Sequence, residues 1–186
     1  TSGSTGHPKG VIHSFGNMMA IAHNMGDEWG FNSKDRMLSY LPLAHAAERA
    51  AVESLSLYAG FHVFFSQGLE TFVQDLQRAE PTIFFSVPRL WTKFYLGVCE
   101  KLPLKKQRIL FKIPILNKIV KKKILTQLGL QQVRLALTGS APLPPHVIEW
   151  YRSLGLELLD VYGMSENFAY SHASRPNQVR VGYVGS

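Results

Sequence analysis

The sequence predicts an α/β fold in which mainly parallel sheets are covered by helices on both faces. Two observations predict it. Stretches with the apolar periodicity of helices alternate along the chain with short apolar runs such as FHVFF (61–65) and TIFFSV (82–87). Helices between consecutive strands also imply right-handed crossovers, which align the strands in parallel and bury both faces of a sheet.

The first half of the chain shows this alternation clearly. In chain order we expect a helix over 14–28, a strand over 36–41, a helix over 46–58, a buried strand over 61–65, a helix over 69–79 and a strand over 82–87. The Ser14 hydroxyl can cap the first helix, whose apolar residues recur every three or four positions. Gly60 ends the second helix. The first and third strands stop at prolines, Pro42 and Pro88, which cannot continue a ladder of hydrogen bonds.

The second half continues the same alternation. We expect a helix over 89–101, basic helices to about 128, a strand over 133–139, a helix to about 154, a strand over 156–163 and a polar tail after 175. Pro103 and Pro114 interrupt the basic helices because proline removes an N–H donor. Pro144 and Pro145 suit the first turn of the following helix, where that donor is not needed.

Composition excludes several classes of protein. Of the 186 residues, 46% are hydrophobic, and ordinary numbers of Gly (15) and Pro (10) predict one globular core. No run of about 18 apolar residues is present, so we expect no transmembrane helix. The histidines lack zinc-site spacing, and no Gly-x-Ser-x-Gly elbow of a serine hydrolase occurs. Because the lone Cys99 cannot form an internal disulfide, we expect a cytoplasmic protein.

The net charge of +7 is concentrated in one stretch. Every charged residue from Lys101 to Lys123 is basic, and the cations alternate with Ile, Leu and Phe at helical spacing. This pattern suits a helix on an anionic membrane surface, so we expect peripheral membrane contact through residues 101–125. A solvated helical face is the alternative. We expect no nucleic-acid partner, because the stretch is apolar and belongs to no recognised nucleic-acid module.

The opening segment TSGSTGHPKG (1–10) is a candidate phosphate-binding loop. Its glycines allow a backbone nest of N–H groups, its Ser and Thr residues add hydroxyl donors, and Lys9 adds a compact positive charge. A surface turn is the alternative. The segment lacks the Gly-Lys-Ser/Thr ending of the nucleoside triphosphatase loop and the dinucleotide pattern G-x-G-x-x-G.

Two further loops, 137–142 and 162–166, follow predicted strands. In parallel sheets ligands bind at the carboxyl ends of strands. We therefore expect these two loops and the segment 1–10 to share one cleft.

Four segments together resemble signatures of the AMP-forming adenylating superfamily, which includes acyl-CoA synthetases, nonribosomal peptide adenylation domains and luciferases. In order they are TSGSTGHPKG (1–10), LPLAHAAER (41–49), LTGSAPL (137–143) and DVYGMSE (160–166). With PTIFFSVPRLWTKFY (81–95), they are most similar to long-chain fatty acyl-CoA synthetases. The resemblance implies that residues 1–186 are a central portion of the AMP-binding domain, in the large N-terminal domain of that fold. An upstream strand, a hinge and a C-terminal domain would then lie outside the chain.

The resemblance implies a ligase that activates a long-chain fatty acid with ATP and Mg²⁺ and passes the acyl group to coenzyme A. AMP and pyrophosphate are released. The substrate carboxylate attacks the α-phosphorus, so the enzyme needs to position anions and supplies no nucleophile. Adenylation of another acid (medium-chain, aryl or amino acid) and a noncatalytic basic membrane-interaction module are the alternatives. We expect this portion alone to be inactive.

The resemblance also implies residue roles. Catalytic roles fall to Lys9, beside the triphosphate, to Glu166, and to His45, beside the acyl site. Thr1 and Glu166 would hold Mg²⁺. The nucleotide would contact Thr1, Ser2, Gly3, Ser4, Thr5, Gly6 and Lys9 in the first loop, and Gly139, Ser140, Ala141, Asp160, Val161, Tyr162, Gly163 and Ser165 in the later ones.

A purely structural role is the alternative for several of these residues. Glu166 could cap a helix, since an acid in a first turn is favourable. His45 could be structural, and Tyr162 could be a core aromatic residue. An apolar acyl tunnel could use Phe, Leu and Val of FFSVPRLW (84–91) and of LSLYAGFHVFF (55–65), but core packing explains the same residues.

Overall fold

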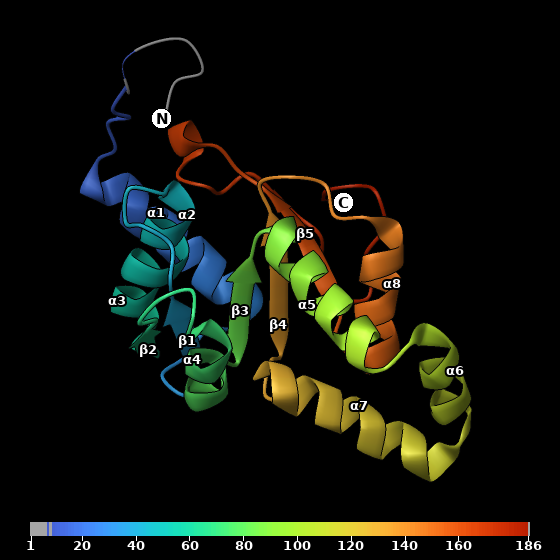
Figure 1. Cartoon of the computed structure of the whole chain (residues 1–186). Coiled ribbons are helices and arrows are strands. Elements are labelled where there is room, and N and C mark those ends of the chain that lie inside the picture. The colour runs from blue at the N-terminus through green and yellow to red at the C-terminus, as the bar shows by residue number, and fades with distance from the viewer. Residues whose placement is uncertain (1–6, 8, 186) are drawn as a thin grey trace.

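The computed structural model describes residues 7 and 9–185, and Figure 1 shows the arrangement of its elements. In chain order these are α1 (Phe15–Trp29), β1 (Arg36–Ser39), α2 (Ala46–Glu48), a π-helical segment (Arg49–Ser54), α3 (Leu55–Ala59), β2 (His62–Phe65), α4 (Phe72–Ala79), β3 (Ile83–Ser86), α5 (Pro88–Lys101), α6 (Leu104–Lys112), α7 (Pro114–Leu128), β4 (Leu135–Gly139), α8 (Pro145–Leu154), β5 (Leu158–Tyr162), a 3-10 turn (Ser165–Asn167) and β6 (His172–Ala173).

The strands form two sheets. β1 pairs in parallel with β2, and the second sheet has the order β3-β4-β5-β6. Within it β3, β4 and β5 are parallel, and only β6 runs antiparallel to its neighbour. The backbone N–H of Thr82 donates to the carbonyl of Arg36 at 3.0 Å, which holds β1 beside the start of β3. The predicted α/β class with mainly parallel sheets is confirmed.

Helices cover both faces of the larger sheet, as the alternation of its strand residues requires. Ile83 and Leu159 belong to an apolar cluster with residues of α1, the π-helical segment and α3. Phe84 and Leu158 belong to the cluster on the other face, which includes Trp91 and residues of α4, α5, α7 and α8. Figure 1 shows α5 and α8 lying across this second face.

Several expected elements differ in detail. The strand expected over 61–65 is buried only at Phe61, because β2 has β1 as its one partner strand among the described residues and Phe65 is 72% exposed. The helix expected over 46–58 contains the π-helical segment 49–54, a change of winding that apolar spacing does not reveal. β6 was missed because two residues carry no periodicity.

A buried carboxylate joins the chain segments at the amino ends of the strands. Asp35 is only 3% exposed and receives hydrogen bonds from Nε and Nη2 of Arg134, at 2.9 and 2.7 Å. The Thr82 hydroxyl donates to the same carboxylate at 2.7 Å. Arg134 also donates to the carbonyls of Trp29 and Gly30 at the end of α1, both at 3.0 Å. The Asp35–Arg134 pair thus connects α1 with the starts of β1, β3 and β4.

Opposing effects set the pKa of Asp35. Burial by itself would raise the pKa, but the hydrogen bonds from Arg134, Thr82 and the backbone of Asn32 outweigh it and hold the pKa below its ordinary value. The carboxylate is therefore ionised in the folded protein at neutral pH.

Arg134→Ala is expected to lower the free energy of unfolding by about 3 kcal/mol, because it leaves a buried carboxylate without its partner. The unfolded-state pKa of Asp is about 3.9. Since the folded-state value lies below it, the pair's contribution is full above that pH and is lost as the pH falls through the folded pKa. Urea titrations of parent and variant across this range measure both effects.

The matched control is Arg152→Ala on the exposed surface of α8, which should change stability by no more than about 0.5 kcal/mol. Equal losses for the two arginine variants would contradict the structural role of Arg134.

Candidate nucleotide-binding cleft

A cleft of about 860 Å³ opens where β3, β4 and β5 end. Its walls come from the first described residues, the β1–α2 loop and the loops after β4 and β5. The cleft is lined by Lys9, Gly10, Pro42, Ala44, His45, Ala46, Ala47, Phe85, Gly139, Ser140, Val161, Gly163, Met164, Ser165 and Ala169. Segments far apart in sequence therefore meet at the carboxyl edge of the sheet, as parallel strands require.

The predicted site residues divide into those that line the cleft and those that do not. The lining includes Lys9, His45, Gly139, Ser140, Val161, Gly163 and Ser165. Ala141, Asp160, Tyr162 and Glu166 are outside the lining, and Thr1, Ser2, Gly3, Ser4, Thr5 and Gly6 lie outside the described residues.

The residues outside the lining nevertheless adjoin the cleft in sequence. Tyr162 ends β5, is 48% exposed, and has its ring 6.1 Å from that of His172. Glu166 is exposed in the 3-10 turn that begins at the cleft residue Ser165. Asp160 is different, because its side chain is buried and this burial raises the pKa of its carboxyl.

Two glycines permit close backbone contacts at this edge of the sheet, Gly139 between β4 and β5 and Gly163 within the loop after β5. A Cβ at Gly139 would lie 2.8 Å from the carbonyl oxygen of Val161, and one at Gly163 would lie 2.4 Å from the carbonyl carbon of Ala169. Ser140, directly after β4, has φ +71°, a left-handed conformation uncommon for a residue other than glycine. Such conformations cluster at functional sites.

His13 joins the opening segment to the loop after β5. Its Nε2 donates to the carbonyl oxygen of Ser165 at 2.6 Å, and its ring meets that of Phe168 edge-on, with 5.1 Å between centroids. Sequence reasoning missed this role, because the two partners are 152 residues apart and no spacing signal links them. His13 is a positioning residue that holds the chain after Lys9 against the cleft.

A buried acid positions the β1–α2 loop. Glu48 is 2% exposed and accepts hydrogen bonds from the Ser39 hydroxyl and from the backbone N–H groups of Tyr40 and Leu41, while burial raises the pKa of its carboxyl. His45 caps α2, since its Nδ1 accepts from the backbone N–H of Ala47 at 3.3 Å. His45 therefore has a structural contact and a place in the cleft lining. Glu48 was part of the LPLAHAAER motif, but no signal in the motif showed its burial.

A small cavity of about 260 Å³ adjoins the cleft and shares Ala47, Phe85, Val161 and Ala169 with it. Its lining is mixed, because Glu28, His172 and Arg175 also contribute to it. Ala50 and Ala51 of the π-helical segment also line it, so their small side chains leave the space. Among the described residues, none from 55–65 lines this cavity, whereas Phe85 of the FFSVPRLW stretch does. Leu55 and Phe61 of the LSLYAGFHVFF segment belong to the apolar core, which agrees with the core-packing alternative for these residues.

Comparison with known proteins decides the family. Residues 1–186 match the family model described as AMP-binding enzyme. The chain belongs to the AMP-binding enzyme family. It is similar to fatty acyl-CoA synthetase A of Dictyostelium discoideum, with 36% identity over 205 residues that cover 100% of this chain and 30% of that protein. It is also similar to the peroxisomal long chain acyl-CoA synthetase 6 of Arabidopsis thaliana, with 34% identity covering 100% of this chain and 29% of that protein.

Solved structures of similar fold include the ATP-bound RpMatB-BxBclM chimera B3. The TM-score is 0.70 and the identity 26%, over 100% of this chain and 32% of the chimera. This AMP-binding enzyme chain therefore has the fold predicted from the resemblance to acyl-CoA synthetases. It spans between 29% and 38% of the length of the curated relatives it matches.

The magnesium-bound nucleotide implied by the resemblance to the adenylating superfamily would need oxygen ligands beside the cleft. Among residues 7 and 9–185 no group of three or more His, Cys, Asp or Glu side chains could hold a metal ion. Mg²⁺ at phosphate sites is usually held by one or two carboxylates together with phosphate oxygens and waters. The exposed Glu166, next to the cleft residue Ser165, fits that requirement.

His13→Ala is expected to loosen the loop after β5, because it removes both the hydrogen bond to Ser165 and the ring contact with Phe168. Backbone amides of residues 163–169 should exchange hydrogen for deuterium faster, since local opening needs less free energy. Mass spectrometry of peptides from this region measures the change.

His13→Gln keeps an N–H donor and should restore part of the protection, whereas His23→Ala, on exposed α1, should leave residues 163–169 unchanged. Unaltered exchange in His13→Ala would show that His13 does not hold this loop.

Proposed function

We propose that the complete protein activates a carboxylic acid with ATP and then transfers the acyl group to coenzyme A. The observation that carries this proposal is the convergence of the AMP-binding signatures in one cleft. Lys9, His45, Ser140 and Ser165 come from four separate segments and line the same space. The acyl-CoA synthetase names of the relatives support the reaction, and residues 1–186 would form the central portion of its AMP-binding domain.

The proposed reaction has two steps. The carboxylate oxygen of the substrate attacks the α-phosphorus, the bond from that phosphorus to pyrophosphate breaks, and an acyl-adenylate forms. The coenzyme A thiol then attacks the acyl carbon, forming a thioester and releasing AMP. Neither step requires a nucleophile from the protein, so catalysis depends on positioning and on neutralising phosphate charge.

The residues of the chain take these roles in the proposal. Lys9 and the loop from Ser2 to Gly6 enclose the β- and γ-phosphates, and the Ser165 hydroxyl approaches the α-phosphate. Glu166 and Thr1 would hold Mg²⁺, which would supply positive charge against the phosphate oxygens.

Adenine would be held between small residues and an aromatic ring. Gly139, Ser140 and Ala141 form one wall in this proposal, and Tyr162 stacks on the base. Val161 lines the cleft, whereas the Asp160 carboxyl is buried outside its lining. Val161 is therefore better placed than the Asp160 side chain to border the amino edge of adenine.

The proposed acid is a long-chain fatty acid. The apolar part of the cavity beside the cleft, formed by residues such as Phe85 and Leu137, supports an apolar acyl group. His45 lines the adjoining cleft, where its side chain gates or positions the acid in this proposal. The names of the relatives in Dictyostelium discoideum and Arabidopsis thaliana support a long acyl chain in the substrate.

Lys9→Ala is expected to lower ATP–pyrophosphate exchange by the complete protein about a hundredfold, because it removes a cation from the developing phosphate charge. Glu166→Gln should lower exchange by a similar factor and raise the concentration of Mg²⁺ needed for half-maximal rate. The assay uses hexadecanoate as the acid.

Lys34→Ala is the control, because this exposed lysine lies outside the cleft lining and its loss should leave exchange unchanged. Exchange unaltered by both Lys9→Ala and Glu166→Gln would contradict the proposed site. Faster exchange with benzoate than with hexadecanoate would contradict the long-chain substrate and leave adenylation intact.

We also propose that residues 101–125 make peripheral contact with an anionic membrane. No helix in the described part of the chain is long and apolar enough to cross a bilayer. Instead α6 and α7 expose isoleucines among their cations: Ile109 is 63% exposed, Ile115 75% and Ile119 55%. Exposed apolar side chains beside lysines are the combination that binds the surface of anionic lipid.

Replacing Lys105, Lys118 and Lys122 by Gln is expected to weaken binding to vesicles containing phosphatidylserine at least tenfold. Each cation near the surface contributes about 1 kcal/mol to the free energy of binding. Co-sedimentation at low salt measures the affinity. Vesicles of phosphatidylcholine alone should bind parent and variant equally weakly. Equal affinity of parent and variant for the anionic vesicles would overturn the membrane contact.

A further inference from the structure

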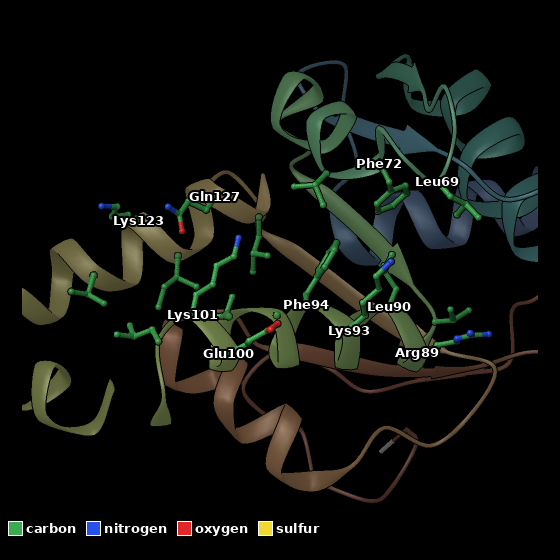
Figure 2. A pocket seen from close by; sticks show the side chains of 18 of the residues that line it. Leu69, Phe72, Arg89, Leu90, Lys93, Phe94, Glu100, Lys101, Lys123 and Gln127 are labelled. Carbon is green, nitrogen blue, oxygen red and sulfur yellow. The ribbon is translucent and has the colours of Figure 1, made fainter. Parts of the chain in front are cut away.

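A larger apolar cavity lies on the opposite face of the sheet from the small cavity beside the cleft. Its volume is about 1050 Å³, slightly above the range of about 300–1,000 Å³ common for small-molecule sites. Residues of α4, α5, α6 and α7 form most of its wall, and Figure 2 shows their side chains converging on the space between these helices. It shares no lining residue with the cleft or with the small cavity.

The interior of this cavity is apolar. Phe72 and Phe94 contribute aromatic rings, and Ile124 and Leu128 contribute side chains from α7 that are less than a tenth exposed. Val98, Leu102, Leu110 and Val120 add further aliphatic surface. An apolar space of this size favours a hydrocarbon ligand, because water gains few hydrogen bonds there.

The rim of the cavity is basic. Arg89, Lys93, Lys101 and Lys123 are exposed residues of the lining, and Glu100 is the acid among them. In the part of the chain that the structure describes, none of these cations belongs to an ion pair. The rim therefore carries positive charge that the fold does not neutralise.

The four cations lie toward both ends of α5. Figure 2 shows Lys101 extending from α5 into the gap toward α7, where Lys123 and Gln127 lie. Arg89 and Lys93 lie toward the other end of α5. Donors on two facing helices thus gather at one end of an apolar space, which is complementary to an anionic head group attached to a hydrocarbon chain.

We propose that this cavity binds a single-chain anionic amphiphile of the fatty-acid class, at a site separate from the nucleotide cleft. The hydrocarbon chain packs among Phe94, Val98 and Ile124, and the carboxylate meets Lys101 and Lys123. The proposal does not depend on adenylation, because it rests on the lining and charge of a cavity that shares no residue with the cleft.

Gly97 offers a direct way to fill the cavity. It lies in its lining on α5, and a Cβ added there meets nothing within 4 Å. Gly97→Leu therefore places a side chain in the space without a backbone clash, and leucine favours a helix more than glycine does. The variant should fold at least as stably as the parent, which thermal unfolding checks.

Calorimetric titration of the complete protein with hexadecanoate tests the site. We expect Gly97→Leu to lower the affinity for hexadecanoate at one class of binding site at least tenfold, because the added side chain occupies the ligand volume. Gly16→Leu, in α1 outside the cavity, is the matched control and should bind as the parent does. ATP–pyrophosphate exchange at saturating hexadecanoate should be unchanged in Gly97→Leu.

A second variant tests the head group. The double variant Lys101→Gln/Lys123→Gln should bind hexadecanoate about tenfold more weakly than the parent and bind hexadecanol with unchanged affinity. Neutralising Lys105, Lys118 and Lys122, which do not line the cavity, should have little effect on either ligand.

Each other outcome overturns the proposal. Absence of hexadecanoate binding, or binding unaffected by Gly97→Leu, would show that this cavity does not hold the fatty acid. The cavity would then be empty or covered by another segment of the complete protein. A parent dimer that Gly97→Leu dissociates would identify a second copy of the chain as the occupant. Loss of exchange activity in Gly97→Leu would assign the cavity to the acid substrate, leaving adenylation itself intact.

Discussion

The parallel register of β4 and β5 is the constraint on which the cleft depends. Gly139 lies opposite Val161 in the ladder, at a separation that leaves no room for a Cβ. The loops that follow these strands therefore leave the sheet at the same level and face one another. A slip of one residue would turn each side chain of the moved strand to the opposite face and carry the following loop with it.

The two edges of the sheet have different chemistry. At the amino ends, an ion pair between the buried Asp35 and Arg134 joins four chain segments. Its hydrogen bonds are made to other groups of the protein. At the carboxyl ends, glycines and exposed polar side chains leave space for a ligand. His13 completes that edge by holding the segment after Lys9 to the loop at Ser165. Stability and binding are thus assigned to opposite ends of the same strands.

Local patterns were sufficient to predict the fold class and most elements. The Ser14 cap and the prolines at 88, 114 and 145 placed helix boundaries, because they act through backbone geometry within a few residues. Exposure of β2 and the winding change after Glu48 depend on tertiary neighbours, so periodicity could not reveal them. The motifs likewise located the cleft, whereas the contacts of His13 and the burial of Asp160 appear only in three dimensions.

Adenine is proposed to bind between the loops after β4 and β5. Photolabelling of the complete protein with an ATP analogue that carries an azide on adenine tests it most directly. After digestion, the label is expected on peptides containing residues 137–143 and 160–166, and excess ATP should prevent it. Labelling that ATP prevents but that falls only on other segments would contradict the claim.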